Sequence, residues 1–317
     1  MLQILSSTLP IFILMVIGYG AVRANLLSKD MLMGIGRFVL YFAVPSLIFK
    51  TLSESHLQDI VDPYFLAAYG IGSLACFLLL FTFFKLAFKN SITESGLKGF
   101  GSALPNSIFI GYPLLLQVLD HPPIGAFAMA LLVENILIFP LALIVMDIGA
   151  SVNSQKSFAG MLKEIVTQLA KNPILIAIIA GSLASTTGFQ LPEIADKIVT
   201  MMAQASAATS LFFVGGLLVG TTIKGSTRSI AAVSIGKLII HPLLVAICVL
   251  LLPDFDPQLQ MTAVLLATSP MLAIFPIIGA KYGHGQISAS IMLVTTVASF
   301  VTISAILLFI SNSNIGL

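Results

Sequence analysis

The chain has 317 residues, of which 58% are hydrophobic and 9% are charged, and its mean hydropathy is +1.06. These values exclude a soluble globular domain, because the surface of such a domain must be wetted by polar and charged side chains. The net charge of +2 is too small to indicate a nucleic-acid partner, and we predict none.

Ten apolar stretches are long enough to cross a hydrocarbon core about 30 Å thick as helices of about 20 residues. They cover roughly residues 4–22, 34–51, 63–88, 98–118, 123–148, 171–189, 198–222, 229–252, 258–281 and 286–312. No basic segment precedes the first stretch and no small-residue cleavage site follows it, so we expect a retained span rather than a signal peptide. The sequence predicts an all-α membrane protein with ten transmembrane helices.

The basic residues indicate how these helices are oriented. Twelve of the 15 lysines and arginines lie in or beside the loops after the first, third, fifth, seventh and ninth stretches. Lys50 and Lys197 lie on the other side, and Lys237 lies within a stretch. Because basic loops remain in the cytoplasm, we predict a multi-pass protein of the cytoplasmic (inner) membrane with both termini outside.

The fourth and ninth stretches contain helix-breaking segments, Leu104 to Pro113 and Ser269 to Pro276. Each proline removes a backbone donor and leaves a carbonyl in need of another partner. Interrupted helices at matching places in two halves are typical of a transporter's substrate site. The candidate substrate-binding residues are Pro105, Asn106, Ser107, Gly111, Pro113, Ser269, Pro270 and Pro276.

Asn106 follows Pro105 at the point where the helix is expected to open. Its amide is placed to donate to a substrate carboxylate, and the N-terminus of the following half-helix adds a positive dipole. The alternative is a structural hydrogen bond between two helices. The residue at the corresponding place in the second half, Ser269, is also polar.

An internal repeat relates the two halves. A shift of 163 positions aligns Pro10 with Pro173, Gly18 with Gly181, Asn106 with Ser269, Pro113 with Pro276 and Gly125 with Ser288. Each half contains five stretches, an odd number, so the second half must enter the membrane from the opposite side. We predict two inverted five-helix repeats with broken crossover helices 4 and 9. The repeats cover residues 1–150 and 171–317, and a polar cytoplasmic linker covers 151–170.

Four polar residues inside the stretches are candidates for ion coupling. Glu134 and Asn135 lie near the middle of the fifth stretch, where an unpaired carboxylate costs about 3 kcal/mol. Lys237 and His241 are four residues apart and therefore share one helix face. Glu134 is a proton carrier, a coupling site or half of a salt bridge with Lys237, and His241 takes part in proton coupling or bonds a freed carbonyl. A further alternative is that Glu134, Lys237 and His241 serve a second carboxylate of the substrate.

Other features have packing explanations or indicate no chemistry. Pro45 is expected to kink the second stretch, and Gly215 with Gly216 to let the seventh approach a neighbour closely. Cys76 and Cys248 are expected to be core residues without a disulfide or metal role. No metal-ligand spacing, nucleophile with a paired base, or phosphate-binding glycine loop is evident, so we expect no enzyme, no cofactor and no metal.

The motif Leu104-Pro105-Asn106-Ser107 with Gly111-Tyr112-Pro113-Leu114-Leu115 resembles the fourth span of the auxin efflux carrier family, which includes plant PIN carriers and bacterial organic-anion permeases. Phe42 to Pro45, and Pro276 to Tyr282 with its Ala280, are similar to that family's second and ninth spans. The resemblance covers the whole chain in span count and repeat order. It implies that Asn106 contacts the substrate carboxylate.

The resemblance also implies a fold shared with bile-acid sodium symporters. In that fold, spans 1, 2, 6 and 7 form a scaffold, often dimeric, and spans 3–5 and 8–10 form a transport domain that moves like an elevator. Short bacterial relatives are commonly assigned malonate or malate. We therefore predict a secondary transporter of a small carboxylate in the lipid bilayer, with a homodimer through the scaffold. The alternatives are an exporter of indole-type carboxylates such as auxin, and a membrane anion sensor that does not transport.

Overall fold

The computed structural model describes residues 2–54, 61–119, 121–150 and 158–312, and over these ranges the chain is helical with no β-strand. This confirms the predicted all-α class. Within these ranges, six helical segments are long and apolar enough to cross a membrane: Lys29–Glu54, Pro63–Leu86, Ile124–Ala150, Glu193–Leu217, Thr227–Leu251 and Gly285–Phe309. Several such helices in one chain make a multi-pass membrane protein.

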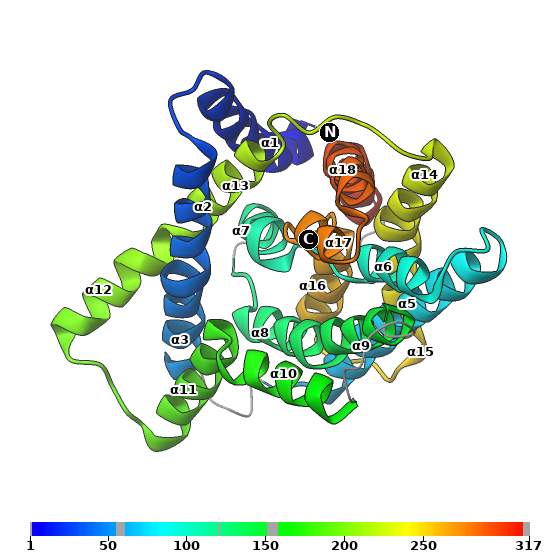
Figure 1. Ribbon diagram of the computed structural model, residues 1–317. Coiled ribbons are helices and arrows are strands. Elements are labelled where there is room, and N and C mark those ends of the chain that lie inside the picture. Colours follow the sequence, from blue (N-terminus) through cyan, green and yellow to red (C-terminus); the bar gives the residue numbers. More distant parts are fainter. Residues whose placement is uncertain (1, 55–60, 120, 151–157, 313–317) are drawn as a thin grey trace.

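Helices lie at each of the ten predicted positions (Figure 1). In chain order they are α1 (Leu2–Arg23), α2 (Lys29–Phe38), η1 (Val39–Ala43), α3 (Val44–Glu54), α5 (Pro63–Leu86), α6 (Ile92–Ala103), η2 (Ser107–Gly111), α7 (Tyr112–Val118), α8 (Ile124–Leu132), η3 (Val133–Ile138), α9 (Phe139–Ala150), α10 (Phe158–Ala170), α11 (Pro173–Thr187), α12 (Glu193–Gln204), α13 (Ser206–Leu217), α14 (Thr227–Ile235), η5 (Gly236–Ile240), α15 (His241–Leu251), α16 (Pro257–Thr268), α17 (Phe275–Lys281) and α18 (Gly285–Asn312).

Helix α10 lies in the segment predicted as the linker loop, so the prediction of a loop there is wrong for residues 158–170. The polar run that suggested a loop covers 151–157 and lies outside the described residues. The segment after it carries apolar residues at helical spacing, Leu162, Val166 and Leu169, which is typical of an amphipathic helix.

Four π-helical turns, labelled η, interrupt the α-helices of the described chain, and each ends two residues before a proline. The prolines after η1, η2, η3 and η5 are Pro45, Pro113, Pro140 and Pro242. Proline has no N–H for the bond to the carbonyl four residues earlier, and its ring collides with that carbonyl. A wider turn relieves the collision and keeps the helix continuous. At Pro45, where a kink is predicted, the helix contains such a turn.

Glycines bring two pairs of helices into close contact, α1 with α13 and α11 with α3 (Figure 1). A Cβ on Gly18 would lie 2.0 Å from the carbonyl oxygen of Phe212, and one on Gly181 would lie 3.0 Å from that of Phe49. On Gly215 it would lie 1.8 Å from the carbonyl oxygen of Met15, which confirms the close approach predicted for the seventh stretch.

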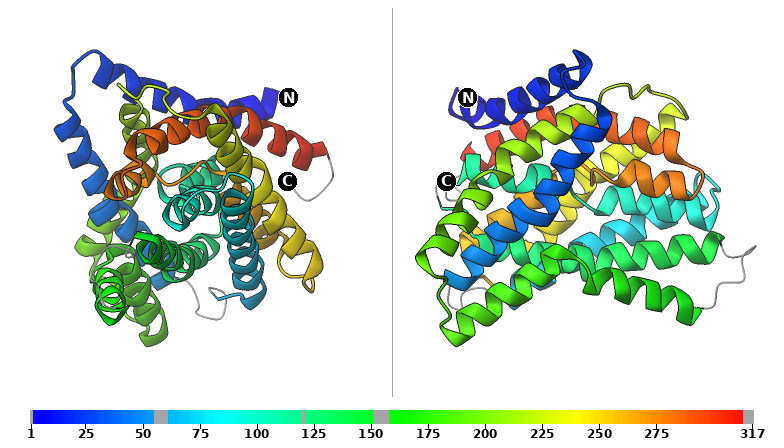
Figure 2. Two further views of the ribbon diagram at one scale, coloured as in Figure 1. Left: turned by 45° about the vertical axis from the view of Figure 1, so that its right-hand side comes forward. Right: turned by 60° about the vertical axis from the view of Figure 1, so that its left-hand side comes forward.

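The remaining helices surround the two interruptions. Helix α5 packs on α6 and α15, α6 on α9, α16 on α15, and α17 on α18. In the left view of Figure 2, the segment after α6 and the segment after α16 lie in the middle of the molecule with helices on every visible side. The core is therefore built around the two places where the helices stop.

Candidate functional site

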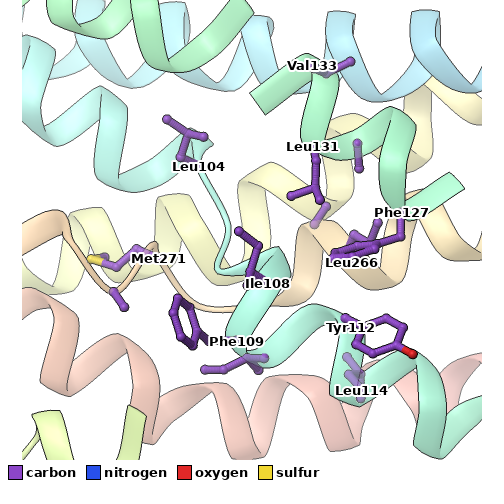
Figure 3. Packing of buried hydrophobic residues seen from close by; sticks show 14 of the residues in the cluster. Leu104, Ile108, Phe109, Tyr112, Leu114, Phe127, Leu131, Val133, Leu266 and Met271 are labelled. Atoms are coloured by element: carbon purple, nitrogen blue, oxygen red, sulfur yellow. The ribbon is translucent and has the colours of Figure 1, made fainter. Parts of the chain in front are cut away.

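The two interruptions cross each other and pair through their backbones. The N–H of Asn106 donates to the carbonyl of Pro270 at 2.7 Å, and the N–H of Leu272 donates to the carbonyl of Leu104 at 3.3 Å. Pro105 and Met271 face each other as an antiparallel bridge. Figure 3 shows Leu104, Ile108 and Phe109 on one segment and Met271 on the other. Each interruption thus supplies partners for the backbone groups that the other frees.

Asn106 is buried, with 1% of its surface exposed, and caps the half-helix that begins with η2. Its Oδ1 accepts a hydrogen bond from the N–H of Phe109 at 3.3 Å. No described residue accepts a hydrogen bond from its Nδ2, so the amide nitrogen is the part of the side chain left to donate to a ligand. The cap also holds the N-terminus of the half-helix, with its positive dipole, at the crossing.

Ser269 lies on the other side of the crossing, fully buried, and its Oγ has no hydrogen-bond partner among the described residues. A Cβ on Gly111 would lie 3.1 Å from this oxygen, so Gly111 leaves room for the hydroxyl. Pro113 and Pro276 lie in the first turns of α7 and α17. Ser269 and Gly111 therefore lie close together, and the two prolines begin the helices that follow the two interruptions.

Glu134 lies in η3, and its carboxyl group bonds two hydroxyl groups, one of which belongs to Ser107 beside the crossing. Its Oε1 accepts hydrogen bonds from Ser107 Oγ at 2.5 Å and from Tyr69 OH at 2.7 Å. A salt bridge with Lys237 is not found within the described chain, so that alternative is wrong: each charge has neutral polar partners instead. Tyr69 is a site residue that the sequence analysis misses, and the only signal is that a tyrosine in an apolar helix needs a partner for its hydroxyl.

Lys237 and His241 form a second buried cluster. Lys237 Nζ contacts His241 Nδ1 at 2.6 Å and donates to the carbonyl of Ala267 at 3.1 Å. The other ring nitrogen of His241 lies 2.9 Å from Ser73 Oγ. The predicted shared face of Lys237 and His241 is confirmed. Ala267 is near the end of α16, where the helix dipole is negative, so the ammonium group is well placed electrostatically.

Both clusters reach α5, where Tyr69 and Ser73 are one turn apart. The rings of Tyr69 and His241 have centroids 6.3 Å apart. The first cluster contacts the start of η2 and the second contacts the end of α16. Each broken helix therefore has its own buried polar cluster, and α5 lies between them.

Asn135 belongs to neither cluster. Its Nδ2 donates to the carbonyl of Leu131 at 2.8 Å, and its Oδ1 accepts from Asn172 Nδ2 at 3.0 Å. Asn172 caps α11 with its own Oδ1, which accepts from the N–H of Ile174. The asparagine pair thus links η3 to the start of α11.

A cavity of about 420 Å³ lies against the crossing. Its lining includes Leu104, Ile108 and Phe109 from one broken segment, Leu272, Ala273 and Ile274 from the other, Glu134 and Asn135 from η3, Leu40 and Tyr41 from η1, and Gln168, Lys171 and Asn172 before α11. Asn106 is not among the lining residues, although Leu104 and Ile108, two positions away on either side, are. Most of the wall is apolar, and the polar groups come from η3 and from the segment before α11.

Two further cavities lie along α2 and α3. One of about 200 Å³ is lined by Arg37 and Phe213 and shares Phe109 and Ile274 with the first cavity. The other, of about 390 Å³, lies between Lys50 on α3, Tyr112 on α7 and Gln204 on α12. The first of these two cavities contacts η2 through Phe109, and the second contacts α7 through Tyr112. No group of three metal-binding side chains occurs among the described residues.

Comparison with known proteins identifies the kind of molecule that has this site. A family model described as "Membrane transport protein" matches residues 3–307. A protein named "Putative malonate transporter" from Rhizobium meliloti is 28% identical over 98% of this chain and 97% of its own length.

Two longer proteins also match. The "Lysosomal cholesterol signaling protein" of Mus musculus is 23% identical over 82% of this chain, and "Auxin efflux carrier component 4" of Arabidopsis thaliana is 32% identical over 43% of it. The matched parts are 31% and 21% of those two proteins, respectively.

Proposed function

The chain belongs to the membrane transport protein family, and we propose that it is a secondary transporter that moves a small organic anion by alternating access. The observation that carries the proposal is the crossing of two broken helices beside a cavity of about 420 Å³. Half-helix N-termini at such crossings attract anionic groups. Asn106 holds one of these N-termini and keeps its amide nitrogen as a donor. We assign Asn106 to the substrate carboxylate.

Malonate or a similar dicarboxylate is the first candidate substrate. The support is the relative from Rhizobium meliloti, because the match extends over nearly the whole length of both chains. That relative's name concerns its own substrate, and the assignment to this chain is part of the proposal.

The ten-helix inverted repeat is part of the same proposal. Gly18 on α1 packs on Phe212 of α13, and Gly181 on α11 packs on Phe49 of α3. Both the two glycines and the two phenylalanines are 163 positions apart, the offset that aligns the two halves. Equivalent contacts at equivalent positions support two repeats of opposite orientation. With the basic loops in the cytoplasm, both termini lie outside the inner membrane.

An elevator movement is supported by where the cavities lie. We define the scaffold as α1, α2, η1, α3 and α11 to α13, and the transport unit as α5 to α9 with α14 to α18. Each of the three cavities is lined by residues of both units. The contact between the units is therefore incompletely packed, as sliding of one past the other requires. We further propose that the scaffold forms a homodimer.

Glu134, Lys237 and His241 are proposed to couple the movement to protons. All three are buried within the transport unit and have neutral or cationic partners but no opposite charge within salt-bridge distance in the described chain. Ionisable groups at such positions mark proton pathways in membrane proteins. Asn135, which bonds Asn172 of the scaffold, is proposed to take part in opening the site rather than in coupling.

An indole-type carboxylate is the second candidate substrate. The specific observation is that the cavity wall is mainly apolar, with residues such as Tyr41, Phe109 and Phe139. An aromatic body fits such a wall better than malonate does, because malonate is charged at both ends. A membrane anion sensor is a third reading, and it is separated from transport by the experiment below.

The test is uptake of radiolabelled malonate, malate and indole acetate into liposomes that contain the purified protein, under an imposed membrane potential. We expect saturable uptake of one of these anions, lost in Asn106→Ala. Binding without uptake would contradict a transporter and indicate a sensor. If none of the three anions is bound or taken up, the anion class that we propose is refuted.

A further inference from the structure

One wall of the cavity of about 420 Å³ is formed by the end of α10 and the start of α11. This wall includes Gln168, Lys171 and Asn172, and the same cavity is lined by Glu134 and Asn135 of the transport unit. Lys171 and Asn172 directly precede α11, which packs along α3 through Gly181, so these two residues belong with the scaffold. A bound anion would therefore contact both units at once.

Most polar groups around this cavity already have partners. The carboxylate of Glu134 accepts from Ser107 and Tyr69. The side-chain amides of Asn135 and Asn172 bond each other, and their remaining groups bond the carbonyl of Leu131 and the N–H of Ile174. These residues are satisfied without a ligand.

Lys171 differs from them. Its side chain is exposed and lines the cavity, yet it has no ion-pair partner in the part of the chain that the structure describes. The cavity thus offers one unpaired positive charge.

We infer that Lys171 binds a carboxylate of the transported anion while the site faces the cytoplasm, and that this contact breaks when the transport unit moves. The inference rests on the proposed transport function and adds a residue that sets the affinity on one side of the membrane. The anion travels with Asn106 and the crossing, whereas Lys171 stays with α11. Lys171 therefore contributes to binding on the cytoplasmic side and contributes nothing on the outer side.

The test compares transport from the two sides in oriented membrane vesicles, inside-out and right-side-out. For Lys171→Gln we expect the KM on the cytoplasmic side to rise about tenfold, the loss of one charge-assisted contact. The KM on the outer side is expected to stay unchanged. Lys171→Arg keeps the charge and is expected to keep the cytoplasmic KM close to that of the original protein.

Lys163→Gln is the matched control, because Lys163 lies on α10, is exposed, and does not line the cavity. It removes the same charge from the same segment and so measures any effect on orientation in the membrane. Equal behaviour of Lys171→Gln and Lys163→Gln, or an equal rise of KM on both sides, would overturn the inference while leaving transport established. Absence of transport in the original protein would instead refute the proposed function.

Discussion

The two ends of the Asn106 amide have different surroundings. The oxygen caps η2 through the N–H of Phe109, and the nitrogen has no acceptor among the described residues. The structural role as a cap and the proposed role in substrate binding therefore concern different atoms and are compatible. A substitution that keeps one atom and removes the other can separate them.

We predict that Asn106→Ala and Asn106→Asp both abolish saturable uptake. The first removes the cap and the donor, and loss of a cap costs about 1 kcal/mol of stability, which leaves the protein folded. The second keeps an oxygen for the cap but replaces the donor by a charge that repels a carboxylate. Substrate affinity and melting temperature in detergent check both points. Full activity of Asn106→Asp would show that only the cap matters.

Glu134→Gln keeps an oxygen that accepts from Tyr69 and Ser107 but cannot release or take up a proton. If Glu134 carries protons, the uptake rate of this variant should no longer vary with pH as it does in the original protein. Uptake measured from pH 5 to pH 9 checks this. Tyr69→Phe serves as a control that loses a hydrogen bond but leaves the carboxyl group in place. An unaltered pH profile together with a lower melting temperature would assign Glu134 a structural role.

At the scale of elements, glycines and prolines determine how the helices pack and where they stop. The close contacts of α1 with α13 and of α11 with α3 require glycine, since a side chain would meet backbone atoms that cannot rotate away. The prolines after the π-helical turns act on their own helices. The effect of a proline is local, and a glycine permits close approach to any helix that it meets, so the sequence analysis predicts the close approach at Gly215 without knowing its partner.

Gly18→Leu is expected to prevent α1 from packing on α13, because its Cβ would lie 2.0 Å from a carbonyl oxygen. Overpacking of this kind costs about 1–3 kcal/mol or more. Gly20→Leu is the matched control, two positions further along the same helix, where nothing lies within 4 Å of the added Cβ. Yield of monodisperse protein and melting temperature are the measurements. Equal stability of the two variants would argue against this contact.

At the scale of the whole molecule, the proposed elevator requires the scaffold and the transport unit to separate at the cavities. The hydrogen bond of 3.0 Å between Asn135 and Asn172 joins the two units directly. By contrast, the ion pair of 2.7 Å between Lys50 and Asp196 joins α3 to α12 within the scaffold. The proposed movement would break the contact between Asn135 and Asn172 and leave the contact between Lys50 and Asp196 intact.

In the double variant Asn135→Cys, Asn172→Cys, a short cleavable cross-linker between the two cysteines is expected to stop transport. Cleavage of the cross-linker should restore the transport rate that the double variant had before cross-linking. The background lacks the natural thiols of Cys76 and Cys248. The same cross-link between Lys50→Cys and Asp196→Cys should leave the rate unchanged, because both residues belong to one unit. Undiminished transport through a cross-linked 135–172 pair would rule out movement between the units at this point.

The sequence alone predicts the positions of the ten long apolar helices and the interruptions near Pro105 and Pro270, but not helix α10. The length of an apolar stretch must match the bilayer, and a proline changes its own backbone whatever surrounds it. It also identified Asn106, Ser107, Glu134, Lys237 and His241 as residues that need an explanation, because polar groups are costly in an apolar helix.

The contacts between these groups follow from the tertiary structure and not from the sequence pattern. Glu134 bonds Tyr69 and Ser107 instead of Lys237, Lys237 bonds His241 and Ala267, and Lys171 lies at a cavity. Such pairings depend on the rotation of each helix about its axis and on the crossing of two segments more than 160 residues apart. The length of an apolar stretch and the positions of its prolines carry no information on helix rotation or on the crossing. Both the rotation and the crossing are set by the packing of all the helices together.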